Sequence, residues 1–258
     1  MILFLLLFAV LRSAALTHGN AGGTASKKTN ALRVPFHVTV TTKVHSDLYI
    51  CGGAIISNVH ILTAGSCTRS YVNDRIETQL LVRVGSPLWN VYGVVHKVKN
   101  VVRHPSYQEL DAGSPRFDLC IITLEKPIKF NGNAKAIKIS DKNVTRNDYA
   151  IITGFGPASF AEMNTGAPTR LRGFKVPFLP YNLCNKYFPA NGLSTGTGCT
   201  FKSHKASFKG DIGGPVIFGT ELIGIVSWVP RFDVGMPTVY TDLTHPEVRS
   251  FIDGVTRF

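Results

Sequence analysis

The chain has 258 residues, of which 44% are hydrophobic, and it carries a formal net charge of +12 at pH 7. This length allows one large all-β domain or two small ones. The hydrophobic fraction is enough for a core that needs no additional disulfides or metal ions for stability, which excludes a small disulfide-dependent scaffold. The positive charge favours acidic partners: sulfated glycans, anionic membranes, acidic proteins or nucleic acid. A basic, soluble surface without a dedicated ligand is the alternative.

The first predicted element is a signal peptide. Residues 2–10 form an uninterrupted apolar run as long as a signal-peptide core, and small residues after it offer cleavage points. The run is too short to span a bilayer and no later run is long enough either, so we expect no transmembrane segment. We expect residues 1–19 to be a signal peptide and residues 20–258 to form a secreted, extracellular domain.

The rest of the chain shows a strand-rich pattern that ends in one helix. Short runs rich in Val, Ile, Thr and Phe alternate with clusters of Gly, Pro, Asn and Asp. These runs are residues 35–42, 80–84, 93–102, 119–124, 149–154, 171–177, 215–218, 222–228 and 238–242. Many short strands with frequent turns predict an antiparallel sandwich or barrel, hence an all-β fold. Near the end, Val248, Phe251, Ile252 and Val255 recur at helical spacing and predict a helix with one apolar face.

Cysteines, histidines and one sequon suggest further features. Five cysteines in a secreted chain predict two disulfides and one free thiol. Cys120 falls on a predicted buried strand, where we interpret it as a small core residue rather than a reactive thiol. Asn143-Val144-Thr145 is a sequon in a polar stretch, so Asn143 either carries a glycan or stays unmodified. The histidines have neither i, i+4 pairing nor neighbouring carboxylates, so we expect no metal and no cofactor.

Five blocks carry a resemblance to a known family. They are residues 51–67 (CGGAII and VHILTAGSC), 117–124 (FDLCIITL), 210–215 (GDIGGP), 224–228 (GIVSW) and 237–241 (PTVYT). In this chain order they resemble the blocks of trypsin-like serine proteases, from about residue 21 to the end. The resemblance implies two six-stranded antiparallel β-barrels with a cleft between them and a C-terminal α-helix.

The resemblance also implies the disulfide pairing. Cys51 pairs with Cys67, and Cys184 pairs with Cys199. A third bridge of the family falls on Phe208 and Phe232, so both of its cysteines are replaced together. We expect two aromatic rings to pack where that disulfide would be.

The family mechanism needs a serine nucleophile, a histidine base and an aspartate that orients the histidine. The matching positions here hold Ile212, Ser66 and Asp118. Isoleucine has no nucleophilic atom, and a serine hydroxyl has no pKa near neutrality, so neither can do its part. His60 lies six residues before Ser66 on an extended segment, about 20 Å away, which is too far to act as the base. The resemblance therefore implies a serine protease homologue with a degenerate triad and no proteolytic activity.

The substrate pocket of the family is altered as well. Val229 and Thr238 occupy positions where the family has glycines that open the pocket, and Ala206 occupies the floor position where trypsin has aspartate. Branched side chains at two glycine positions predict a blocked specificity pocket.

A catalytically inactive protease homologue can still bind other molecules, and we consider three candidate functions. The cysteine framework and residues 130–137 (FNGNAKAI) look similar to mite gut trypsins of the group 3 allergen type. Parasitic mites have inactivated paralogues of these proteins, so this resemblance implies inhibition of host defence proteins such as complement. The third function, a non-catalytic cofactor in a protease cascade, usually comes with an N-terminal cysteine-rich module, which we do not see.

The second function is binding of a polyanion, such as a sulfated glycan, or of a membrane. Its candidate residues are basic pairs and one basic loop: Lys97 and Lys99, Arg170 and Arg172, and Lys202, Lys205 and Lys209. We expect no nucleic acid, because no platform of aromatic and basic residues accompanies the charge.

Overall fold

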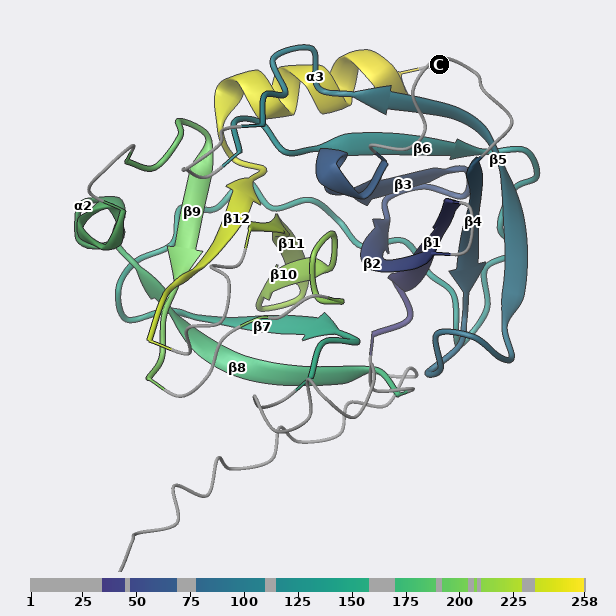
Figure 1. Ribbon diagram of the computed structural model, residues 1–258, viewed down its shortest axis with the longest axis horizontal. Helices are drawn as coiled ribbons and strands as arrows, with labels where there is room; N and C mark the ends of the chain where they lie inside the picture. The colour runs from purple at the N-terminus through teal and green to yellow at the C-terminus, as the bar shows by residue number, and fades with distance from the viewer. Residues whose placement is uncertain are drawn as a thin grey trace, which may run out of the picture.

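The computed structural model describes residues 34–44, 47–68, 78–109, 115–157, 170–188, 192–203, 207, 210–228 and 235–257. Within these ranges the strands form two closed antiparallel barrels that lie side by side (Figure 1). The first barrel has the strand order β1-β2-β3-β6-β5-β4, and the second has the order β10-β11-β12-β9-β8-β7. The predicted fold of two six-stranded barrels with a C-terminal helix is therefore confirmed.

The strand bounds partly agree with the pattern. The first barrel consists of β1 (His37–Val44), β2 (Asp47–Ile55), β3 (His60–Thr63), β4 (Thr78–Val84), β5 (Val94–Arg103) and β6 (Cys120–Leu124). The second consists of β7 (Tyr149–Gly154), β8 (Arg172–Leu179), β9 (Thr197–Thr200), β10 (Pro215–Phe218), β11 (Glu221–Trp228) and β12 (Thr238–Asp242). The pattern gave β7, β10 and β12 with the same bounds, whereas it did not include β2, β3 or β9.

Short helices complete the described chain. They are the 3-10 helices η2 (Gly65–Thr68) and η3 (Asn185–Tyr187), and the α-helices α2 (Tyr181–Cys184) and α3 (Pro246–Thr256). Helix α3 buries Val248 and Ile252, and it packs Phe251 and Val255 against the same cluster. The predicted apolar face is thus confirmed. No helix among the described residues is long and apolar enough to cross a membrane.

The two barrels meet in a shared core. Leu62, Leu119 and Ile121 of the first barrel lie in one buried cluster with Phe155 and Ile225 of the second. Burial of apolar surface at this seam is the main force that holds the barrels together.

Backbones approach closely at the seam. A Cβ atom on Gly52 of β2 would lie 2.5 Å from the Cα of Gly214, so the contact leaves no room for a side chain. The amide of Gly52 also donates to the carbonyl oxygen of Ile212 at 2.8 Å. The segments around residues 52 and 212 are therefore held in direct contact.

A buried histidine also lies at the seam. Nδ1 of His37 on β1 is 2.9 Å from Oγ1 of Thr153 on β7, and its ring meets the ring of Phe155 edge-on at 5.7 Å. Its Nε2 makes no hydrogen bond with the described residues. Burial lowers the pKa of His37 from 6.5 to about 3, because the charged ring would be desolvated.

Both implied disulfides are present, and the remaining described cysteine is a thiol. Cys51 is bonded to Cys67, and Cys184 is bonded to Cys199. Cys120 is fully buried on β6, and burial raises the pKa of its thiol to about 12, as expected for a core residue.

Several sequence expectations lie outside the described residues. They are the signal peptide at 1–19 and the positions of Lys205, Ala206, Phe208, Lys209, Val229 and Phe232.

We predict that His37 makes the protein less stable in mild acid. Because its folded-state pKa lies below the unfolded value of 6.5, the folded chain binds fewer protons between pH 6.5 and 3, so the free energy of unfolding falls as the pH falls through this window. From pH 7 to 5 the loss from this group is about 2 kcal/mol. In His37→Gln the amide keeps the contact with Thr153 but does not titrate, so most of this loss should vanish in urea unfolding at the two pH values.

The matched control is His96→Gln, which removes a half-exposed imidazole from β5. The difference between pH 7 and 5 should be smaller in His37→Gln than in this control. If His37→Gln kept the same difference, His37 would not be the buried neutral group described here.

Candidate functional site

The three triad positions come from elements on both sides of the seam. Ser66 lies in η2, which follows β3, while Asp118 lies two residues before β6 of the same barrel. Ile212 lies on the loop that leads into β10 of the second barrel. Sγ of Cys67, the residue after Ser66, is 3.8 Å from the carbonyl oxygen of Ile212. The fold therefore brings all three positions to one place, as the resemblance implies.

Asp118 is the centre of a buried network. Its Oδ1 accepts from the amide of Ser66 at 2.7 Å, and its Oδ2 accepts from Oγ of Ser66 at 3.0 Å. Oγ of Ser227 on β11 donates to Oδ2 at 2.8 Å. The carboxylate is fully buried, so these donors offset the cost of removing its charge from water.

The backbone of Asp118 is tied to the second barrel too. Oγ1 of Thr241 on β12 donates to the carbonyl oxygen of Asp118 at 2.9 Å. The preceding residue, Phe117, has a positive φ of 45°, a backbone conformation that non-glycine residues rarely adopt. Asp118 is thus held from η2, β11 and β12 at once.

Ser66 is oriented as a donor at this site. Its hydroxyl proton points to Asp118, and a serine hydroxyl cannot accept a second proton near neutral pH. The geometry therefore gives Ser66 no capacity to activate a nucleophile.

The loop around Ile212 keeps a tightly bonded shape. Gly210 and Gly213 have positive φ values of 105° and 79°. The amide of Gly213 donates to the carbonyl oxygen of Val226 at 2.7 Å, and Oδ1 of Asp211 accepts from the amide of Gly156 at 2.8 Å. The side chain of Ile212 is half-buried against the core cluster at the seam. The loop is held by these hydrogen bonds, and it carries a hydrocarbon side chain at the position that we predicted to correspond to the nucleophile.

Thr238 is the one of the three pocket positions that the structure describes. It lies buried on β12, and its Oγ1 accepts from the amide of Ser207 at 3.1 Å. Thr200 lies directly opposite Thr238 on β9. The Thr238 side chain therefore links β12 to the segment at Ser207. The blocked pocket remains a prediction for Thr238 as for Ala206 and Val229.

Ser227 and Thr241 belong to the site, but they were not predicted from the sequence. Both lie in blocks that we assigned to strands, and both are polar residues in runs that are otherwise mostly apolar. A buried hydroxyl in such a run needs a partner, and this was the available signal.

The remaining polar candidates lie elsewhere. His60 is buried at the start of β3, where its Nδ1 is 3.0 Å from Oγ of Ser57, and burial lowers its pKa. Among the described residues, no group of three His, Cys, Asp or Glu side chains could hold a metal ion.

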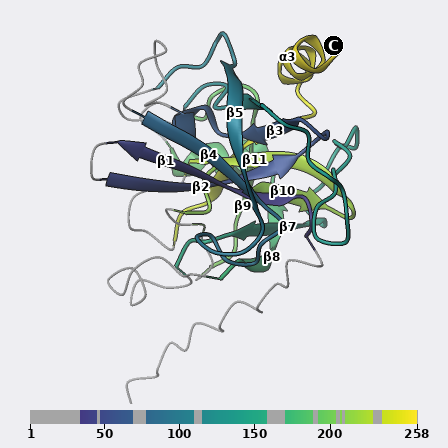
Figure 2. The ribbon, with the colours of Figure 1, turned by 90° about the vertical axis from the view of Figure 1, so that its right-hand side faces the viewer.

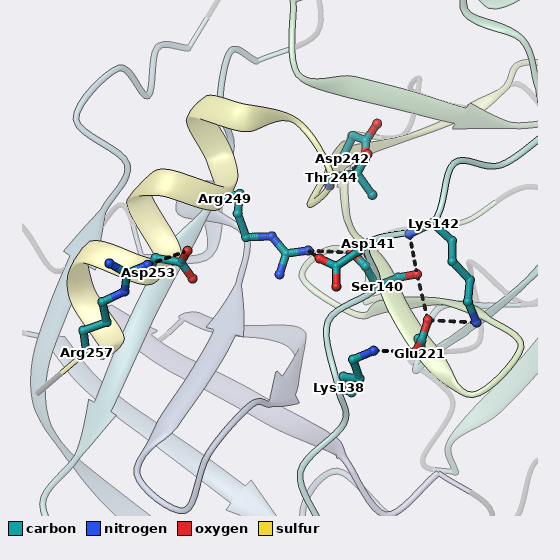
Figure 3. Close-up of polar contacts among 10 residues, drawn as sticks. All are labelled: Lys138, Ser140, Asp141, Lys142, Glu221, Asp242, Thr244, Arg249, Asp253 and Arg257. Carbon is teal, nitrogen blue, oxygen red and sulfur yellow. Dashed lines mark hydrogen bonds and ion pairs between the residues drawn. The ribbon is translucent and has the colours of Figure 1, made fainter.

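Asn143 is exposed and lines a groove of about 600 Å³ beside α3. The same region holds a set of polar contacts (Figure 3). Glu221 pairs with Lys138 at 3.0 Å and with Lys142 at 3.1 Å, and Arg249 pairs with Asp141 at 2.7 Å. These contacts fix the segment before the sequon without covering Asn143.

The family model described as Trypsin matches residues 20–252. The chain belongs to the trypsin family. It is 30% identical over 207 residues to hypodermin-A of Hypoderma lineatum, covering 79% of this chain and 77% of that protein. It is 31% identical over 233 residues to trypsin 5G1 of Aedes aegypti, covering 86% and 80%.

Two solved structures share the trypsin fold. Neuropsin, a serine protease expressed in the limbic system of mouse brain, matches with a TM-score of 0.76 and 21% identity, covering 90% of this chain and 98% of neuropsin. The scabies mite inactivated protease paralogue S-D1 matches with a TM-score of 0.77 and 19% identity, covering 90% and 96%. At these identities the two structures establish the fold and nothing more.

We predict that Ser227 stabilises the folded protein through Asp118. Ser227→Ala leaves the buried carboxylate with one donor fewer, and a hydrogen bond to a charged group contributes about 1.5–3 kcal/mol. The free energy of unfolding in urea should fall by this amount. Ser250→Ala, a change of the same chemistry on the exposed side of α3, is the control and should not destabilise the protein. Equal stability of the two variants would show that the Ser227 hydroxyl does not support Asp118.

Proposed function

We propose that this trypsin-family chain is a secreted pseudoenzyme that binds extracellular proteins without cutting them. The observation that carries the proposal is the network at Asp118, which is completed by the hydroxyls of Ser66 and Ser227 while Ile212 occupies the nucleophile position. Triad members act as a unit, and the loss of the serine or the histidine alone costs on the order of 10⁶ in turnover. Here both are replaced.

What remains is a rigid frame for binding loops. The two barrels, both disulfides and the bonded loop around Ile212 are in place. A scaffold of this kind can hold a binding surface after its chemistry is lost. The match in fold to a protein described as an inactivated protease paralogue is consistent with this function, although most relatives of the chain are described as trypsins.

We propose host defence proteins, and complement components in particular, as the partners. Support comes from the similarity of the cysteine framework and of residues 130–137 to mite gut trypsins. Two disulfides suit an oxidising, extracellular compartment. The exposed Asn143 suits a glycan. The alternatives are a polyanion-binding role, which the exposed Lys97, Lys99 and Lys202 would serve, and a non-catalytic role in a protease cascade.

The catalytic part of the proposal is tested with short peptide esters and a fluorophosphonate probe for active serines. The wild-type protein should neither hydrolyse the ester nor take up the probe, because it has no nucleophile and no base at the site. Restoring both groups in the double variant Ser66→His, Ile212→Ser should leave hydrolysis negligible, because we expect the side chains of Thr238 and Val229 to block the specificity pocket. Hydrolysis by wild type would refute the pseudoenzyme assignment. Hydrolysis by the double variant alone would refute only the blocked pocket.

The partner is tested by complement deposition in human serum at physiological salt. The protein for this test is produced by secretion from eukaryotic cells. Its first residue and its intact mass are determined beforehand, and a mass without a glycan would contradict the assignment of Asn143 as a glycosylation site. We expect dose-dependent loss of deposition that survives modest increases in salt. No loss of deposition would refute complement as the partner. Loss that modest salt erases would favour charge-driven binding to sulfated glycans.

A further inference from the structure

We propose that residues 91–95, here called the β4–β5 tip, dock the protein onto membranes that contain anionic lipids. The tip includes none of the three triad positions, so this inference goes beyond the binding function proposed above. Its side chains include four exposed hydrophobics: Val91 at 43%, Tyr92 at 74%, Val94 at 61% and Val95 at 45%. Strand β5, which continues from the tip, lies on the side of the first barrel that faces the viewer in Figure 2.

The backbone of the tip is fixed from inside. The guanidinium of Arg83 on β4 donates to the carbonyl oxygen of Trp89 at 3.1 Å and to that of Tyr92 at 2.6 Å. Oγ of Ser86 donates to the carbonyl oxygen of Val91 at 2.6 Å. The carbonyl oxygens of Trp89, Val91 and Tyr92 therefore all accept hydrogen bonds from side chains. These bonds hold the tip and the residues before it in one shape.

The loop that leads to the tip is anchored to both barrels. The amide of Leu171 donates to the carbonyl oxygen of Pro87 at 2.8 Å. The side chain of Trp89 packs against the core cluster at the seam, whereas Tyr92 points to solvent. Because the loop is already ordered, little conformational entropy is lost when its exposed side chains bind.

The exposed hydrophobics contribute little to the fold. A side chain that stays in water gains no burial, and turns of this kind ordinarily carry Gly, Asn, Asp or Ser. A group of adjacent exposed apolar residues with a polar rim marks a surface that binds something.

The charge around the tip indicates an anionic lipid surface. Lys97 and Lys99 are exposed on β5 beside the tip, and neither forms an ion pair within the part of the chain that the structure describes. Valine and tyrosine side chains can enter the boundary between headgroups and acyl chains, while lysines beside them stay at the level of the phosphates. A sulfated glycan offers no apolar phase, so it would leave the four hydrophobics without a role.

Co-sedimentation with vesicles tests the proposal. The full mature protein is mixed with vesicles of phosphatidylcholine containing about 30% phosphatidylserine, and with phosphatidylcholine alone, at about 0.1 M salt. The test variant is Tyr92→Asn with Val94→Thr, because asparagine tolerates the positive φ of 57° at Tyr92 and threonine suits a strand. The matched control is Ile151→Thr, which removes an exposed apolar side chain from β7 of the other barrel. Unfolding midpoints should be the same for all proteins.

We expect the wild-type protein and Ile151→Thr to bind the anionic vesicles, and the tip variant to bind them at least about fivefold more weakly. Lys97→Gln with Lys99→Gln should lower binding to anionic vesicles and leave binding to phosphatidylcholine alone unchanged. Absence of wild-type binding would overturn the proposal, and so would equal binding by the tip variant. Retention on heparin without binding to vesicles would also overturn it, in favour of a sulfated-glycan site.

Discussion

The buried carboxylate of Asp118 is the constraint on which the rest of the site depends. A charge with no access to water must be met by donors, and these come from η2 in the first barrel and β11 in the second. The bond from Thr241 to its carbonyl adds β12. In an active protease the same acid orients a histidine. Here Asp118 accepts hydrogen bonds from Ser66 and from Ser227, and it therefore links the two barrels.

Much of the fold could be predicted from the sequence, because it follows local rules. Strands such as β7 and β12 combine β-branched residues with flanking turn residues, and the face of α3 has helical spacing. Strand β2 carries Gly52 and Gly53, which break the apolar alternation, and only the resemblance marked it as a strand. Strand β9 has the sequence TGCT, with the cysteine as its one clearly apolar residue, so no pattern of apolar residues marks it. Its place depends on pairing with β12, which local sequence does not encode.

In the site, too, some residues could be predicted from the sequence and others could not. Ser66, Asp118 and Ile212 were predicted because each lies inside a block that resembles the family. The partnership of Ser227 with Asp118 spans 109 positions, and that of Thr238 with Ser207 depends on how a loop meets a strand. Such contacts between distant segments depend on how the segments pack. The sequence shows that these residues can form hydrogen bonds, but it does not show which residue is the partner of which.

The contact between Gly52 and Gly214 bears on how such sequences should be interpreted. Both glycines lie in blocks that resemble trypsin-like serine proteases, and neither has room for a Cβ atom. On Gly52 this atom would lie 2.5 Å from the Cα of Gly214, and on Gly214 it would lie 2.5 Å from the carbonyl oxygen of Thr153. The fold therefore requires glycine at both positions, whether or not the protein is catalytically active. The presence of these glycines in a sequence is therefore evidence for the fold and not for catalytic activity. The residues that bear on catalysis are those at the predicted triad positions, Ser66, Asp118 and Ile212.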